Sequence, residues 1–310
     1  MKKFLSFVIC ILAIIIVYIY QDNIVSFLFD TNYKVSDKKI VIPENNEYKI
    51  FNGNYAYVSN TENFVPQSKQ DILNIVYTTL NSGWEEFTFY CPEDYSSCVD
   101  DVVSITNDDG VLSNINGFVH PYNSFKSIET AYTTTGKITL NVHKIYTDQM
   151  INEINKEIDE IYSEKINDTM TIEEKIRALH DHIINISKYD NDRIKGITKY
   201  NSNTAYGNLI EGYGICSGYT DAMAIFLNKM EIENYKIASD KHIWNLVKLN
   251  GKWVHLDLTF DDPVVTAEDP SVDVEKDILQ HDYFLIDTTK LLELDTVEHN
   301  FDKEVYKEAN

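Results

Sequence analysis

The chain has 310 residues, and its 49 acidic side chains against 27 basic ones give it a formal net charge of −22. Such a charge repels a phosphate backbone, so nucleic acid is excluded as a partner. Hydrophobic residues make up 44% of the chain, and this content and length suffice for one large or two modest domains with a proper core.

The first predicted element is an N-terminal membrane helix within residues 1–30. Lys2 and Lys3 precede an uncharged run from Phe4 to Tyr20, which would span about 25 Å as a helix. No small-x-small cleavage site follows, so an uncleaved anchor is favoured over a signal peptide. The lysine flank predicts a single-pass protein of the cell membrane whose remaining chain is extracytoplasmic. The protein would be secreted if the segment were cleaved.

Residues 31–62 are polar and show little periodicity, so they are predicted to form a tether. Residues 63–168 are predicted to form a small α+β domain. Apolar periodicity there predicts a helix, a strand, a hairpin and a helix, over residues 67–80, 84–90, 125–146 and 148–165. No residue of this domain is assigned a chemical role.

Two of the four cysteines are candidates for a disulfide. Cys10 lies in the apolar run and Cys216 in a motif described below, which leaves Cys91 and Cys98 to each other. An extracytoplasmic location permits the bond. Free thiols remain the alternative, because the sequence does not fix the redox state.

A capping box, formed by Thr171 and Glu174, opens a further helix at the start of the region 169–310. His180, Asp181 and His182 lie within that helix. Residues two apart on a helix point to different sides, so a metal ion shared by the two histidines is disfavoured. Neither a metal nor a cofactor is expected.

Residues 261–282 form the most acidic run of the chain. Calcium binding is one interpretation, but the spacing of the carboxylates matches no calcium-loop pattern, which favours a solvated loop. Residues 283–286 are predicted to form a last strand.

Cys216 lies in the segment Gly212-Tyr213-Gly214-Ile215-Cys216-Ser217-Gly218-Tyr219. Apolar residues recur at helical spacing directly after it, so the thiol is predicted to lie at the N-terminus of a helix. The positive end of the helix dipole favours the thiolate, the form of cysteine that attacks a carbonyl carbon.

Asn250 and Gly251 predict a two-residue hairpin turn between two strands. If Leu249 pairs with Lys252, then His242 and Asp257 are diagonal neighbours on one face. That face is predicted to point toward the helix that carries Cys216.

These three segments resemble, in order and character, the core of the transglutaminase-like superfamily of papain-type cysteine enzymes. The resemblance covers about residues 171–310 and rests on G-x-C-x-G-Y, H-x-W-N and D-x-T-F-D-D-P. It implies a nucleophile helix packed on an antiparallel sheet, with Cys216 as nucleophile, His242 as base and Asp257 as the residue that orients it. Phe260 departs from the pattern, because tryptophan is common there.

The resemblance implies acyl transfer at a carboxamide or peptide bond of a protein or peptide substrate. Tyr206, Tyr219 and Trp244 are candidates for substrate binding. A cysteine peptidase or amidase acting on wall or extracellular peptides is the first alternative, since the same triad serves both reactions. A binding module that kept the fold without turnover is the second.

Overall fold

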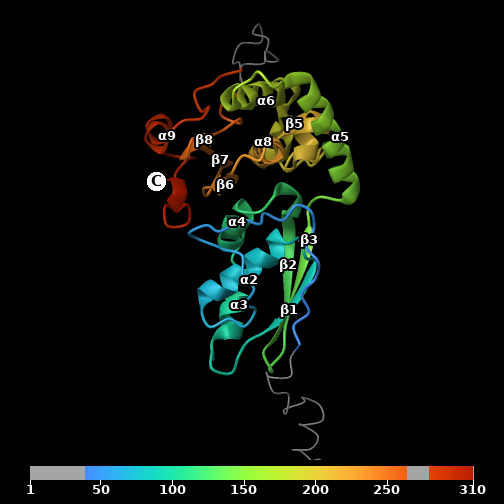
Figure 1. Ribbon diagram of the computed structural model, residues 1–310, viewed down its shortest axis with the longest axis vertical. Helices are drawn as coiled ribbons and strands as arrows, with labels where there is room; N and C mark the ends of the chain where they lie inside the picture. The colour runs from blue at the N-terminus through green and yellow to red at the C-terminus, as the bar shows by residue number, and fades with distance from the viewer. Residues whose placement is uncertain (1–38, 264–278, 310) are drawn as a thin grey trace, which may run out of the picture.

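The computed structural model describes residues 39–263 and 279–309, and it has a mixed α+β architecture. The molecule is elongated (Figure 1). Helices α2–α4 and strands β1–β3 build one half, and helices α5, α6 and α8 with strands β6–β8 build most of the other. The predicted anchor at residues 1–30 lies outside the described residues. Among the helices of the described part, none is long and apolar enough to cross a membrane.

The first half contains a three-stranded antiparallel sheet. The strands lie in the order β1 (Glu86–Tyr90), β3 (Lys137–Lys144) and β2 (Phe125–Tyr132). Strand alternation turns one side of the sheet toward the core, where Phe87 pairs with Leu140 and Phe89 with Ile138. The predicted strand and hairpin are therefore present.

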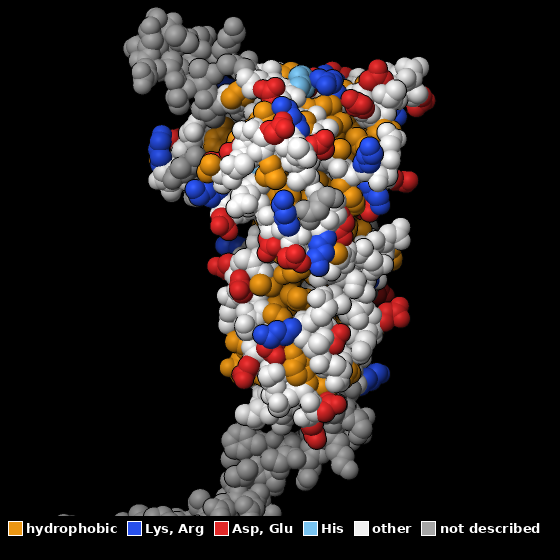
Figure 2. All heavy atoms as spheres, turned by 90° about the vertical axis from the view of Figure 1, so that its left-hand side faces the viewer, with side chains coloured by type: hydrophobic (Ala, Val, Ile, Leu, Met, Phe, Trp, Pro, Cys, Tyr) orange, Lys and Arg blue, Asp and Glu red, His pale blue; other side chains and the backbone are white. Residues whose placement is uncertain are grey.

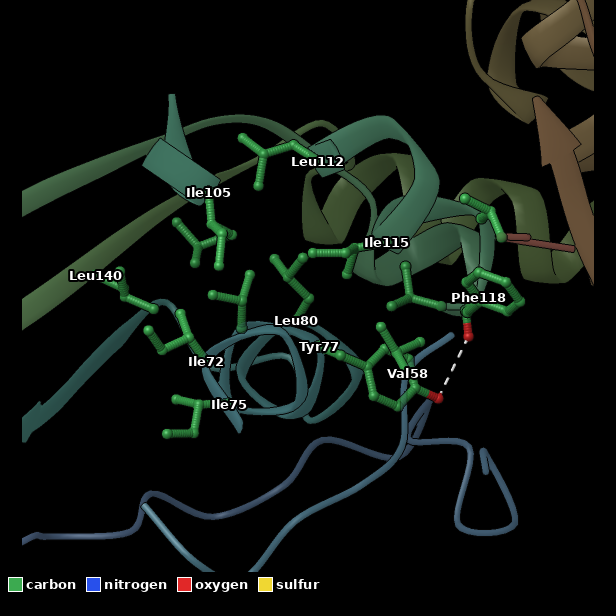
Figure 3. Packing of buried hydrophobic residues seen from close by; sticks show 14 of the residues in the cluster. Val58, Ile72, Ile75, Tyr77, Leu80, Ile105, Leu112, Ile115, Phe118 and Leu140 are labelled. Carbon is green, nitrogen blue, oxygen red and sulfur yellow. Dashed lines mark hydrogen bonds between the residues drawn. The ribbon is translucent and has the colours of Figure 1, made fainter. Parts of the chain in front are cut away.

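Three helices pack with this sheet, namely α2 (Lys69–Asn81), α3 (Cys98–Thr106) and α4 (Asp109–Gly117). Figure 3 shows Ile72 and Leu80 of α2 among Ile105, Ile115 and Leu140 from neighbouring elements. The sequence predicted α2 but neither α3 nor α4. Each of those two helices has 9 residues, which gives the helical period too few repeats to stand out.

The structure forms a disulfide between Cys91 and Cys98, whose Cα atoms are 5.7 Å apart. Cys91 follows β1 directly and Cys98 is the first residue of α3. The bond therefore ties the end of the strand to the start of the helix.

Residues 39–62 differ from the predicted tether, because they lie against the first half. Val58 is 1% exposed within its core. The backbone N–H of Ser59 donates to Asn74 Oδ1 at 3.0 Å, and that of Thr61 donates to Thr78 Oγ1 at 2.9 Å. Polar residues of this stretch and of α2 bind each other, so polarity here does not mean exposure to solvent.

The second half has a helical layer and a three-stranded antiparallel sheet. The helices are α5 (Asp148–Lys165), α6 (Ile172–Ile186) and α8 (Cys216–Lys229); the strands are β6 (Asn234–Ala238), β7 (Ile243–Leu249) and β8 (Lys252–Leu256). The capping box of α6 is present, with Thr171 and Glu174 each accepting the other's backbone N–H. Short elements complete the chain: η2 (Pro121–Asn123), β4 (Lys188–Tyr189), α7 (Asn191–Ile194), η3 (Gly207–Glu211), β5 (Tyr213–Gly214), α9 (Thr288–Leu294) and η4 (Lys307–Ala309).

The two hydrophobic cores do not divide at residue 168, where the sequence placed a domain boundary. Helix α5 was assigned to the small domain, yet its buried Ile154, Ile158 and Ile161 pack with α6 and α8. Conversely, Tyr235 of β6 and Trp244 of β7 belong to the core of the first half. The sheet β6–β7–β8 therefore lies between the two cores, and β8 is partly exposed near the hairpin turn.

A buried ion pair within the second half also contacts the first half, through Ser124. Lys236 Nζ on β6 lies 2.9 Å from Asp221 Oδ1 on α8, and their side chains are 3% and 7% exposed. Lys236 also donates to Ser124 Oγ at 3.1 Å, and the Tyr146 hydroxyl donates to Asp221 Oδ2 at 2.7 Å. These bonds satisfy both charges, as burial requires.

The end of the chain differs from prediction. Residues 283–286 form no strand; Ile286 makes an isolated bridge with His255 instead. Most of the acidic run at 261–282 lies outside the described residues, so the calcium and solvated-loop interpretations are untested there. On the face shown in Figure 2, acidic and basic side chains are interspersed over both halves.

Candidate active site

Cys216 is the first residue of α8, in a tightly packed turn. A Cβ on Gly214 would lie 2.2 Å from Asn208 Nδ2, and one on Gly218 would lie 2.4 Å from the Ser202 carbonyl oxygen. The glycines therefore let residues 202–208 approach the turn closely. Ile215 precedes the helix and supplies no side-chain cap. The thiol is free and partly exposed.

The hairpin has the predicted register. Leu249 pairs with Lys252, and the turn residues Asn250 and Gly251 both have positive φ, at 51° and 76°. Two positive φ values are what a type I′ turn requires. The ladder ends where Asn245 pairs with Leu256. His242 and Asp257 therefore lie just beyond its open end.

These two side chains meet there. His242 Nε2 lies 2.6 Å from Asp257 Oδ2, and the side chains are 3% and 1% exposed. Burial by itself lowers the pKa of His242, but the charge and hydrogen bond of Asp257, followed by the hydrogen bond with Cys216, raise it to about 10. Burial likewise raises the pKa of Asp257, but His242 and His299 outweigh it and hold that pKa below its ordinary value.

The imidazole thus lies between a carboxylate and a thiol. Nε2 is engaged by Asp257, which leaves Nδ1 for Cys216. Such a ring can hold a thiolate as an ion pair while the carboxylate fixes its orientation. The structure brings together Cys216, His242 and Asp257, the predicted triad residues.

Helix α8 lies on the opposite face of the hairpin from the one predicted. Its core residues pack with Val247 and Leu256, and Asn245 Nδ2 donates to the Thr220 carbonyl oxygen at 3.0 Å. Thr220 Oγ1 in turn donates to the Ile243 carbonyl oxygen at 2.9 Å. His242 lies just beyond the end of the β7–β8 ladder. Cys216 can therefore contact it there, although α8 covers the other face of the sheet.

Cys216 and His242 line a cleft of about 310 Å³. The remaining lining residues are Tyr189, Lys241, Thr259, Phe260, Asp262, Pro263 and Glu298. Burial, followed by the negative charges of Cys216 and Glu298, raises the pKa of Tyr189 to about 12, so its phenol stays protonated at neutral pH and can donate a hydrogen bond. The buried Thr259 hydroxyl has no hydrogen-bond partner in the part of the chain that the structure describes.

The three predicted substrate-binding residues do not line this cleft. Trp244 is fully buried, and its Nε1 donates to His255 Nδ1 at 2.9 Å. Tyr219 is also buried, and its hydroxyl donates to Asp262 Oδ2 at 2.5 Å. Tyr206 donates to Glu153 on α5 at 2.7 Å. Aromatic side chains near a motif were assigned to substrate, but two of them are needed as core.

His299 is a site residue that sequence analysis did not identify. It is buried, and its Nε2 lies 2.9 Å from Asp257 Oδ2. Its Nδ1 lies 2.9 Å from Asp295 Oδ2. A histidine four residues after an aspartate in an otherwise polar tail is a weak signal, because nothing local indicates that the tail returns to the triad.

A second histidine cluster supports the loop after Asp257. His180 Nε2 lies 3.1 Å from Asp261 Oδ2, and its Nδ1 lies 2.9 Å from Asp181 Oδ1. His281 Nε2 also contacts Asp181 Oδ1, at 2.7 Å. Burial lowers the pKa of His180, but the hydrogen bonds to Asp181 and Asp261 raise it overall. His180 and Asp181 thus form a cluster with His281, which is 100 positions from Asp181. The helical pattern around His180 did not indicate this contact.

The comparisons with known proteins add little to this geometry. No protein-family model matches the chain, and no curated protein matches it. A solved structure described as "Crystal structure of a TGase" is similar over 49% of this chain and 48% of that chain, with 13% sequence identity and a TM-score of 0.32. The match thus spans about half of either protein.

Proposed function

We propose that this protein is a transglutaminase-like cysteine acyltransferase that acts on carboxamide groups of proteins or peptides. The observation that supports it is the position of the His242 imidazole, between Asp257 and Cys216 at the wall of a cleft. A scaffold has no need to bury a carboxylate and an imidazole beside a partly exposed thiol. We also propose that its core is of the papain type, because the three motifs occur in the order that this type of core requires.

In this mechanism the Cys216 thiolate attacks the carboxamide carbon, and the carbonyl oxygen becomes an oxyanion. The backbone N–H of Cys216, at the start of α8, is positioned as one donor to it. The His242 imidazolium gives its proton to the departing nitrogen, the C–N bond breaks, and ammonia leaves a thioester on Cys216. His242 then takes a proton from an incoming amine or water, which attacks the thioester; the C–S bond breaks and the thiolate–imidazolium pair is restored.

We also propose that the protein is held at the cell membrane by a helix within residues 1–30, with the active site outside the cytoplasm. The uncharged run behind Lys2 and Lys3 supports this proposal. The disulfide between Cys91 and Cys98 supports it independently, because disulfides persist in oxidising compartments.

The test is to incubate purified full-length protein with a glutamine-bearing acceptor protein and a fluorescent primary amine. Incorporation of the amine, lost in Cys216→Ala with the circular dichroism spectrum unchanged, is the expected result. Release of new amino termini would favour the peptidase alternative. Failure of Cys216 to form any thioester with glutamine peptides would leave the binding-module alternative.

A further inference from the structure

Asp257 is shared between two imidazoles. Its Oδ2 lies 2.6 Å from His242 Nε2 and 2.9 Å from His299 Nε2. Its Oδ1 accepts the backbone N–H groups of Thr259 and Phe260, at 2.9 and 3.3 Å. Four donors therefore surround a carboxylate that is 1% exposed. In a Ser-His-Asp triad, by comparison, the carboxylate orients a single imidazole.

The second imidazole has carboxylate oxygens at both of its nitrogens. His299 Nε2 faces Asp257, and His299 Nδ1 faces Asp295 Oδ2 at 2.9 Å. A neutral imidazole has only one N–H, so it would set a lone pair against a carboxylate oxygen at one end. A ring that donates at both ends carries a positive charge, and both hydrogen bonds are then charge-assisted.

The remaining surroundings of His299 hold it in place. Its ring is stacked on Tyr283, with centroids 5.2 Å apart and 17° between the planes, and lies edge-on to Trp244 and Phe260 at 4.8 and 4.6 Å. The titratable groups that face it are Asp257, Asp295, His242, His255 and Tyr283. Asp295 is itself fixed, because it accepts the backbone N–H groups of Glu298 and His299.

We propose that His299 is a positively charged positioning residue, held by Asp295. It fixes the Asp257 carboxylate, so that His242 and His299 share the negative charge of Asp257. This proposal rests on the proposed function, since it concerns the base of the same triad. It has two consequences. Asp257 cannot rotate away from His242, and the imidazolium of His242 is stabilised less than it would be by an unshared carboxylate. His242 can therefore give its proton to the leaving nitrogen more readily.

The first test measures the charge of His299 directly. ¹⁵N-histidine is incorporated into full-length Cys216→Ala protein, and the ring nitrogens are followed by NMR between about pH 6 and pH 8; His299→Gln identifies the resonances. We expect both nitrogens of His299 to be protonated throughout. One unprotonated nitrogen in this range would overturn the proposal. The result does not depend on turnover, so it stands or falls separately from the proposed function.

The second test compares His299→Gln, which retains a neutral donor for Asp257, with His299→Leu, which retains none. The control is His143→Gln, at an exposed position near the end of β3. The pH dependence of Cys216 alkylation by iodoacetamide reports the ion pair, and kcat and KM are measured beside it. We expect His299→Gln to shift the alkaline limb of the profile to higher pH, because Asp257 then acts on His242 undivided. We expect His299→Leu to lower kcat at least tenfold with KM nearly unchanged.

Parental profiles and parental kcat in both variants would overturn the positioning role. If instead Cys216 in the parent titrates as an ordinary thiol near pH 8.5 and His242→Ala changes nothing, the proposed function fails. In that case the NMR result still decides whether His299 is a cation.

Discussion

The His242 imidazole is stacked on the Trp244 indole, with ring centroids 5.7 Å apart and 12° between the planes. The indole is itself fixed, because its Nε1 donates to His255 Nδ1 at 2.9 Å. His255 can accept that bond because burial, followed by the charge of His299, lowers its pKa to about 3 and keeps the ring neutral. Trp244 is thus a buried support for the His242 imidazole.

Replacing the indole tests that support. Trp244→Phe leaves His255 Nδ1 without a donor and removes part of the surface under His242, so we expect the free energy of unfolding to fall by about 2 kcal/mol. Urea unfolding measures it, and acylation of Cys216 should slow in the folded variant. Trp253→Phe, on the partly exposed β8, is the matched control and should change stability less. Equal losses in the two variants would contradict the role of Trp244.

The raised pKa of His242 predicts a dependence of stability on pH. The pKa rises from 6.5 to about 10 on folding, so the charged ring contributes stability fully below about pH 6.5, and this contribution is lost as the pH rises through about 10. We expect the free energy of unfolding to decline over that window, and to decline less in His242→Gln. His143→Gln is the control. If the free energy of unfolding depends on pH in the same way in the parent and in His242→Gln, the ion pair between His242 and Asp257 is not formed.

Asp257→Asn should preserve the fold and impair turnover. The amide can still contact His242, but it no longer holds the ring in the productive tautomer or stabilises its charge. In the comparable serine triad this change lowers kcat about 10⁴-fold. Single-turnover kinetics with a glutamine peptide measure the effect. Acylation at the parental rate would remove Asp257 from the mechanism.

The ion pair between Lys236 and Asp221 predicts a strong asymmetry between single and double variants. Lys236→Met leaves Asp221 buried and uncompensated, so we expect a loss of about 3–5 kcal/mol in the free energy of unfolding. Combining it with Asp221→Leu removes both charges and should recover most of that loss. Chemical denaturation of the single and double variants provides the measurement. If the double variant is no more stable than Lys236→Met, the charges are not coupled.

The disulfide predicts a modest stability change. Cys91 and Cys98 are separated by 7 positions, and closing so short a loop contributes about 2.5 kcal/mol in the chain-entropy model. Cys91→Ser with Cys98→Ser should therefore lower the free energy of unfolding by about that amount without affecting Cys216. Reduction of the parent should produce the same change, and alkylation of both thiols without prior reduction would show that the bond is absent.

The sequence by itself determined the local parts of this protein. The register of the hairpin follows from Asn250 and Gly251, because this pair favours a type I′ turn, which joins two strands by two residues that both have positive φ. The placement of Cys216 at a helix start follows from the glycines before it and the apolar period after it. The capping box at Thr171 is similarly a property of neighbouring residues. Each of these signals lies within a short stretch of chain.

The tertiary structure alone decided what lies around those parts. The hairpin has buried apolar side chains on both faces, Trp244 and Leu246 on one and Val247 and Leu256 on the other. Its sequence pattern therefore does not decide which face α8 covers. His299 reaches Asp257 from 42 positions away, and the tail that carries it has no period to predict its path. Trp244 was assigned to substrate because composition does not distinguish a buried aromatic ring from one that lines a cleft. Contacts between distant residues depend on packing, and packing is fixed only when the cores close.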